Sequence, residues 1–205
     1  MEYRAVGNRC AVILSSFNLN IQPNETLVIL NKEGFRLITV DVVLLARQYV
    51  GVSQYRRGAR PSEAPNVFDC SSFIKWLYGM CGIWLPRRSI QQRNLGEIIE
   101  LNDIRAGDAV FVSGRIDYYE DDSKNGVGHV GIATSDNSVV HAANKKSGVI
   151  ESSFQEFVGA DKFRGARRYI PKEANVLTFE TPPHREVESS DDIKWIIRQS
   201  LPTTK

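Results

Sequence analysis

Cysteine is scarce in this 205-residue chain, which limits how its fold is stabilised. There are three cysteines, Cys10, Cys70 and Cys81. Three is too few for a disulfide framework, and no two of them have the C-x-x-C spacing typical of a zinc site. An odd number leaves at least one thiol free. We expect Cys10 and Cys81 to be small buried hydrophobic residues, and we consider Cys70 separately.

Long apolar runs and concentrated charge are also missing. No run of about 18 apolar residues occurs, so no membrane span is expected. The apolar stretch at 11–14 is too short for a signal-peptide core, so we expect cytoplasmic residence or export by a non-standard route. The net charge is only +2 and the arginine pairs are isolated, so no nucleic-acid partner is expected. The oligomeric state is not indicated.

What remains is the composition of a folded protein with one main domain. Hydrophobic residues make up 42% and charged residues 24% of the chain, which is typical of globular proteins. We predict an N-terminal extension at 1–38, a main domain at 39–171 and a C-terminal extension at 172–205. Residues 27–30 have the pattern of a strand, and residues 191–200 that of a short helix.

Within the main domain, apolar periodicity predicts helices followed by strands. The helices are expected at 39–50, between Asp69 and Gly82, and at 89–95. The strands are expected at 108–113, 129–134, 138–143 and 164–170. Helices that precede a run of antiparallel strands favour an α+β fold over repeated βαβ units.

Cys70 lies where a helix start could activate a thiol. It follows Asp69, a good N-cap residue, and shares a helix face with Phe73 and Leu77 that is turned inward. A helix N-terminus and a nearby imidazolium lower the pKa of a thiol, so we expect a reactive thiolate. The backbone amides of Cys70 and Ser71 are candidate oxyanion donors.

Two of the three histidines lie in one predicted hairpin. His129 and His141 are twelve residues apart, whereas His184 follows two prolines in the tail and is expected at the surface. An odd number of connecting residues would turn both hairpin imidazoles to one face, directly or diagonally opposed. One could then orient the other, as the third member of a catalytic triad does.

The same residues permit other interpretations. Cys70, His129 and His141 could supply three ligands of a zinc site, although a set without a carboxylate or second thiol is uncommon. A buried cysteine at a helix start and a histidine on a strand are also common structural residues. Spacing alone therefore leaves catalysis, metal binding and a structural role open.

Five sequence blocks together resemble the NlpC/P60 family in order and spacing. They are FDCSSF at 68–73, LPRRS at 85–89 with Gln92, GDAVF at 107–111, GHVGI at 128–132 and HA at 141–142. The resemblance runs from about 39 to 170. It implies a papain-like α+β fold with N-terminal helices packed on an antiparallel sheet. It also implies a cysteine endopeptidase, or thiol protease, that acts on peptidoglycan stem peptides of the cell wall, most often between D-γ-glutamate and a diamino acid.

The resemblance also assigns roles to individual residues. It implies Cys70 as nucleophile, His129 as general base, His141 as the residue that orients the base, and Tyr55 as a residue that borders the site. No metal and no organic cofactor is needed by this mechanism. Relatives in the wider superfamily are amidases or acyltransferases, and a catalytically silent binding module is a third alternative.

The chain departs from the family pattern in three places. Ser72 stands where the family usually has glycine. Arg56 and Arg57 replace the start of a usual Trp-Gly-Gly, and they would favour an acidic substrate if they lie beside the cleft, or be ordinary solvated residues if they do not. The long segment 113–126 is expected either to cover the cleft as a lid or to be an exposed loop.

Overall fold

The computed structural model describes residues 3–17, 19, 21–171 and 176–201. The chain divides into two compact units, which we describe separately. The terminal unit comprises Met1–Val40, Tyr78–Trp84 and Pro171–Lys205, and the central unit comprises Asp41–Leu77 and Leu85–Ile170. In the described part of the chain, no helix has both the length and the apolar character needed to cross a membrane.

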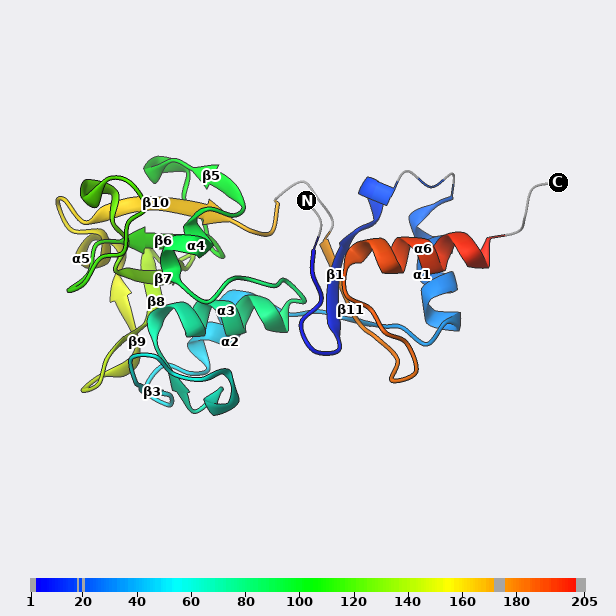
Figure 1. Ribbon diagram of the computed structural model, residues 1–205, viewed down its shortest axis with the longest axis horizontal. Helices are drawn as coiled ribbons and strands as arrows, with labels where there is room; N and C mark the ends of the chain where they lie inside the picture. Colours follow the sequence, from blue (N-terminus) through cyan, green and yellow to red (C-terminus); the bar gives the residue numbers. More distant parts are fainter. Residues whose placement is uncertain (1–2, 18, 20, 172–175, 202–205) are drawn as a thin grey trace. The chain divides into compact units, whose positions relative to one another are not determined.

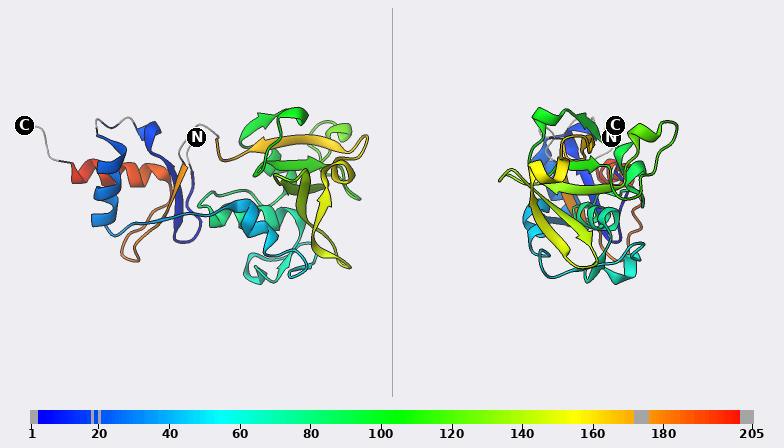
Figure 2. Two further views of the ribbon diagram at one scale, coloured as in Figure 1. Left: turned by 180° about the vertical axis from the view of Figure 1, so that it is seen from behind. Right: turned by 90° about the vertical axis from the view of Figure 1, so that its left-hand side faces the viewer.

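The terminal unit is a three-stranded antiparallel sheet with helices on one face (Figures 1 and 2). Its strands, in spatial order, are β1 (Arg9–Ile13), β11 (Val176–Glu180) and β2 (Arg36–Ile38). Its helices are η1 (Leu14–Phe17), α1 (Pro23–Lys32) and α6 (Ser190–Ser200). Apolar side chains from both layers form its core: Cys10, Val12, Phe17, Leu30, Phe35, Phe179, Ile193, Ile196 and Ile197.

One element of this unit differs from the prediction. The strand expected at 27–30 is wrong, because these residues lie inside α1. Pro23 suits the first turn of a helix, and the Gln22 amide donates a hydrogen bond of 2.8 Å to the Glu25 carboxylate. A short apolar run alone does not distinguish helix from strand. The helix expected at 191–200 is confirmed as α6.

The central unit is built on a six-stranded antiparallel sheet (Figure 1). In spatial order its strands are β5 (Glu97–Ile99), β10 (Phe163–Arg168), β6 (Ala109–Val112), β7 (His129–Ala133), β8 (Ser138–Asn144) and β9 (Gly148–Ser153). A short parallel pair is formed by β3 (Gln54–Tyr55) and β4 (Val67–Phe68). The helices are α2 (Val42–Arg47), α3 (Cys70–Met80, of which Tyr78 onward belongs to the terminal unit), α4 (Ser89–Arg93), α5 (Phe154–Val158), and the short η2 (Pro61–Glu63), η3 (Leu101–Asp103) and η4 (Ser123–Asn125).

This architecture confirms the predicted α+β class with an antiparallel sheet. The four predicted strands correspond to β6, β7, β8 and β10, and the three predicted helices to α2, α3 and α4. The helix expected at 39–50 is shorter and ends at Arg47; it begins at Val42 because Asp41 caps it by accepting the amides of Val43 and Leu44 at 2.9 Å each. Strands β5 and β9 and helix α5 are not predicted.

Three features fix the sheet and the helix that carries Cys70. Strand β6 is buried throughout, as its unbroken apolar run predicts. At its start, the buried Asp108 carboxylate accepts Nε and Nη2 of Arg168 on β10 at 2.8 and 2.7 Å. In α3, Phe73, Ile74 and Leu77 are fully buried, which anchors the helix by its apolar face.

Candidate active site

The first turn of α3 is closed by a reciprocal pair of hydrogen bonds. The Asp69 carboxylate accepts the Ser72 amide at 2.8 Å, and the Ser72 hydroxyl accepts the Asp69 amide at 2.9 Å. This is the capping-box arrangement, with two otherwise unpaired donors satisfied together. The serine that departs from the family pattern thus helps to fix the helix start, and with it the position of Cys70.

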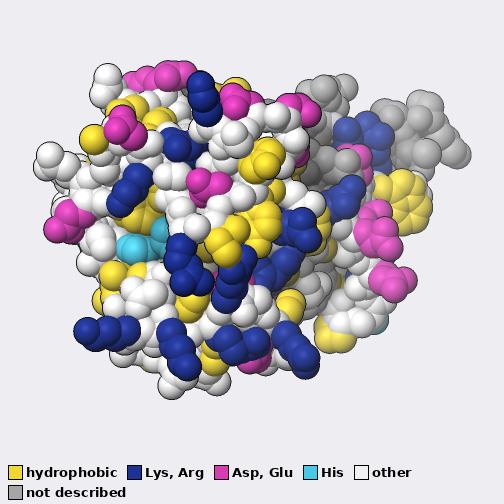
Figure 3. Space-filling model, turned by 60° about the vertical axis from the view of Figure 1, so that its left-hand side comes forward, with side chains coloured by type: hydrophobic (Ala, Val, Ile, Leu, Met, Phe, Trp, Pro, Cys, Tyr) yellow, Lys and Arg dark blue, Asp and Glu magenta, His cyan; other side chains and the backbone are white. Residues whose placement is uncertain are grey.

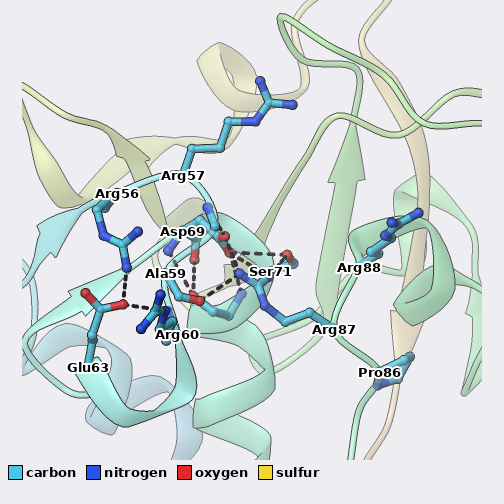
Figure 4. Close-up of polar contacts among 12 residues, drawn as sticks. Arg56, Arg57, Ala59, Arg60, Glu63, Asp69, Ser71, Pro86, Arg87 and Arg88 are labelled. Carbon is cyan, nitrogen blue, oxygen red and sulfur yellow. Dashed lines mark hydrogen bonds and ion pairs between the residues drawn. The ribbon is translucent and has the colours of Figure 1, made fainter.

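Arg87 holds the same turn from outside the helix (Figure 4). Its guanidinium binds both carboxylate oxygens of Asp69, at 3.0 and 2.5 Å, and also donates to the Ser71 hydroxyl and the Ala59 carbonyl, each at 2.9 Å. Burial alone would raise the pKa of Asp69, but the Arg87 guanidinium holds it below its ordinary value. Asp69 is therefore charged at neutral pH.

Cys70 is half-buried as a residue and is the first residue of α3. The backbone amides of Val130, on β7, and of Ser71 lie near its sulfur. Burial, followed by the charge of Asp69, raises the pKa of Cys70 to about 11. The predicted lowering of this pKa is wrong, because the cap that starts the helix is itself an anion and the sulfur is largely shielded from water. The thiol is protonated at neutral pH.

His129 and His141 meet across strands β7 and β8. The last paired residues, Ala133 and Val139, leave residues 134–138 between them, an odd number. The two histidines are therefore diagonal neighbours on one face, as the parity argument predicts. His129 Nε2 lies 2.8 Å from His141 Nδ1, with the rings nearly perpendicular at 82°.

Gly131 and Phe157 shape the space around this pair. Gly131 lies on the shared face, and a Cβ there would lie 2.4 Å from Val139 Cγ1, 3.1 Å from His141 Cβ and 3.1 Å from the Phe157 ring. The Phe157 ring packs on both imidazoles, with centroids 5.6 Å from His129 and 4.8 Å from His141. Burial lowers the pKa of His129 to about 4. Burial and the neighbouring His129 lower that of His141 to about 3, so both rings are neutral at neutral pH.

Ser152 on β9 extends the chain of polar contacts. Its hydroxyl lies 3.1 Å from His141 Nε2, so His141 is held by partners at both ring nitrogens. In the described part of the chain, His129 Nδ1 has no hydrogen bond to another protein group.

The sequence did not predict Ser152 and Phe157 as residues of the site, because neither lies in a predicted element. The Val130 amide was missed because a backbone donor carries no sequence signal.

The central unit contains a cleft of about 920 Å³ that is lined by residues of this site. Cys70, His129 and His141 all face it, as does Tyr55. Burial and the nearby Cys70 and Asp69 raise the pKa of the Tyr55 hydroxyl. His184 does not line the cleft. Among the residues that the structure describes, no cluster of three His, Cys, Asp or Glu side chains is arranged to hold a metal ion.

The long segment 113–126 contributes one wall of this cleft. Arg115, Ile116 and Tyr118 face the cleft, and Tyr118 forms an isolated β-bridge with Val127. The segment is tied down farther along, where Asn94 donates to Glu120 at 2.9 Å. The segment is therefore largely exposed, as one of the two expectations has it, and it also forms part of the site.

Comparisons with known proteins agree with this architecture. Residues 51–168, more than half of the chain, match the NlpC/P60 family. A gamma-DL-glutamyl hydrolase of Bacillus subtilis is 32% identical over 147 residues, which are 69% of this chain and 33% of the relative. A gamma-D-glutamyl-L-lysine dipeptidyl-peptidase of Bacillus cereus is 29% identical over 106 residues, 51% of this chain and 29% of the relative. The chain thus spans about a third of the length of these relatives.

The fold has counterparts among solved structures. NlpC2 from Trichomonas vaginalis aligns with a TM-score of 0.53 and 24% identity, over 64% of this chain and 46% of that protein. Identity at this level supports the fold alone. The family match, by contrast, includes every residue of the cleft named so far, from Tyr55 to Phe157. The chain therefore belongs to the NlpC/P60 family.

Proposed function

We propose that this protein is a cysteine peptidase of the cell wall that hydrolyses the bond between D-γ-glutamate and a diamino acid in peptidoglycan stem peptides. The observation that carries the proposal is that a thiol at a helix start lines one cleft together with two imidazoles, whose Nε2 and Nδ1 atoms lie 2.8 Å apart. The names of the two bacterial relatives support a γ-glutamyl bond as the target. We assign catalysis to the domain at 39–171, between its two extensions.

In this proposal His129 acts as a neutral general base. For Nδ1 of His129 to accept the thiol proton, its Nε2 must carry the ring proton and donate it to His141 Nδ1. The ring proton of His141 then lies on Nε2, where the Ser152 hydroxyl accepts it. Burial keeps both rings uncharged, so the base is in its competent form at neutral pH.

The reaction then follows acyl-transfer chemistry. As His129 Nδ1 takes the proton, the Cys70 sulfur attacks the γ-carbonyl carbon, and the first-turn amides of Cys70 and Ser71 donate to the oxyanion. The C–N bond breaks, and the imidazolium gives its proton to the leaving amine. Water, deprotonated by His129, attacks the thioester, which releases the γ-carboxylate and restores the thiol. Tyr55 borders the acyl group in this arrangement.

Muropeptides of known composition test the proposal, with mass spectrometry of the products. The parent should yield two fragments whose masses sum to the substrate plus one water, with the break after D-γ-glutamate. Cys70→Ala should yield none and keep its thermal unfolding transition. Cys81→Ala, a buried thiol that does not line the cleft, is the control and should cleave normally.

Two outcomes would contradict the proposal. Cleavage by Cys70→Ala at the parent rate would exclude this thiol as the nucleophile. A product in which an added amine, rather than water, captures the acyl group would indicate an acyltransferase instead.

A further inference from the structure

The cleft that holds Cys70 is lined by more positive than negative side chains. The cationic ones are Arg57, Arg87, Arg88, Arg115, Lys145 and Lys162. The anionic ones are Asp69 and Glu156, and Asp69 is already paired with Arg87. Five cations thus face one remaining carboxylate. Figure 3 shows Lys and Arg side chains gathered on a face that also exposes histidine.

None of these five cations forms an ion pair within the described part of the chain, although nearby arginines do. Arg56 binds Glu63, and Arg47 binds Asp136 and Glu151. The contrast between adjacent residues is plain in Figure 4, where Arg56 turns toward Glu63 and Arg57 extends away from the drawn carboxylates. Of the two arginines that replace the family pattern, only Arg57 lines the cleft.

Three of the arginines gather around two tyrosines. The Arg57 guanidinium donates to the Tyr118 hydroxyl at 2.9 Å, and the Arg88 guanidinium lies over the Tyr118 ring, 5.8 Å from its centroid. Arg57 and Arg115 both act electrostatically on Tyr55, as does Cys70. Arg57, Arg88 and Arg115 all line the same cleft as Cys70. The tyrosine contacts position Arg57 and Arg88 but leave most of their N–H donors unused.

We propose that Arg57, Arg88 and Arg115 form a carboxylate-binding subsite beside Cys70, and that the enzyme selects γ-glutamyl peptides whose glutamate keeps a free α-carboxylate over peptides in which that group is amidated. This inference rests on the proposed function, because it concerns the same cleft. In a γ-linked glutamate the α-carboxylate is separated from the reacting carbonyl by three carbons, so both groups occupy one cleft together. A guanidinium binds a carboxylate by two parallel hydrogen bonds, which an uncharged amide cannot match.

Binding to the full-length Cys70→Ala protein tests the subsite without turnover. Isothermal titration calorimetry would use the tripeptide L-Ala–γ-D-Glu–L-Lys and the same peptide with the glutamate α-carboxylate amidated. The carboxylate form should bind about ten-fold more tightly. Its affinity should fall between about 0.05 and about 0.3 M NaCl more steeply than that of the amide.

Arginine variants of the Cys70→Ala protein show which side chains produce the preference for the carboxylate form. Arg57→Gln and Arg88→Gln should each reduce the preference for the carboxylate form, whereas the matched control Arg56→Gln should keep it. Equal binding of the two peptides, or no binding of either, would overturn the inference. So would an Arg56→Gln variant that loses the preference as fully as Arg57→Gln does.

Turnover by the parent, measured separately, distinguishes this inference from the proposed function. Selective binding by Cys70→Ala together with no cleavage by the parent would retain the subsite and reject the peptidase. Equal binding together with cleavage at the γ-glutamyl bond would retain the peptidase and reject the subsite.

Discussion

His129 Nε2 and His141 Nδ1 lie 2.8 Å apart, joined across two neighbouring antiparallel strands. Because one ring nitrogen of each histidine is committed to this contact, the position of one proton determines the others. The Ser152 hydroxyl contacts the other ring nitrogen, His141 Nε2, so that His129, His141 and Ser152 form one chain of polar contacts. With His129 Nδ1 unprotonated and ready to accept the thiol proton, both the pH dependence of activity and the effect of each substitution along this chain of contacts follow.

The acid limb of activity should lie well below the ordinary pKa of histidine. Protonated His129 cannot accept the thiol proton, so kcat/KM should be constant through neutral pH and fall as the pH drops through about 4, the pKa to which burial lowers this residue. A histidine with an unperturbed pKa would give an acid limb at about pH 6.5. A fluorogenic γ-glutamyl peptide assayed at constant ionic strength measures the profile, and a limb near 6.5 would contradict the neutral-base account.

The rate at which iodoacetamide alkylates Cys70 measures the ionisation of the thiol itself, without a substrate whose carboxylates also titrate. Since burial and Asp69 raise the pKa of the thiol to about 11, the rate should still be rising with pH above about 9. A rate that is already constant below about pH 7 would indicate a resting thiolate–imidazolium pair instead. Slow alkylation near neutral pH is therefore no argument against catalysis here.

Ser152 is expected to act as a positioning residue. Ser152→Ala removes the acceptor for His141 Nε2, so we expect kcat to fall about ten-fold, with KM little changed and the acid limb displaced. Ser152→Thr retains a hydroxyl and should restore both the rate and the limb. Ser135→Ala, an exposed serine in the turn between β7 and β8, is the control. An unchanged pH profile in Ser152→Ala would leave Ser152 only a structural role.

Arg87 should matter for stability more than a surface arginine does. Arg87→Met leaves the buried Asp69 carboxylate without its guanidinium, so the free energy of unfolding should fall by roughly 2–3 kcal/mol. Arg56→Met breaks a more exposed pair with Glu63 and should cost less than about 1 kcal/mol. Urea unfolding of both variants measures the difference, and equal losses would show that the Asp69–Arg87 pair does not stabilise the helix start.

The sequence predicts best what depends on local pattern. The α3 helix is bracketed by a capping aspartate and by Gly82, where the backbone takes a positive φ of 73°. The neighbouring positions of His129 and His141 follow from strand parity. Those predictions need only spacing, because helical and strand periodicities are fixed by backbone geometry.

What the sequence does not predict depends on burial and on long-range contacts. The direction of the Cys70 pKa shift is set by desolvation and by Asp69 rather than by the helix dipole. Ser152 and Phe157 reach the histidines from elements whose short, mixed sequences show no clear periodicity. The distinction between Arg56 and Arg57 likewise appears only once Glu63 and Tyr118 are placed beside them.

The central claim, that Cys70 is the nucleophile and His129 its base, is tested most directly by covalent trapping. A γ-glutamyl acyloxymethyl ketone loses its carboxylate leaving group to an attacking thiol and leaves a stable thioether. Intact-mass measurement and peptide mapping should show one adduct, on Cys70, formed much more slowly in His129→Ala. The buried Cys10 and Cys81 serve as internal controls and should stay unmodified. An adduct on either of them, or none on Cys70 in an enzyme that still cleaves the peptide, would contradict the account.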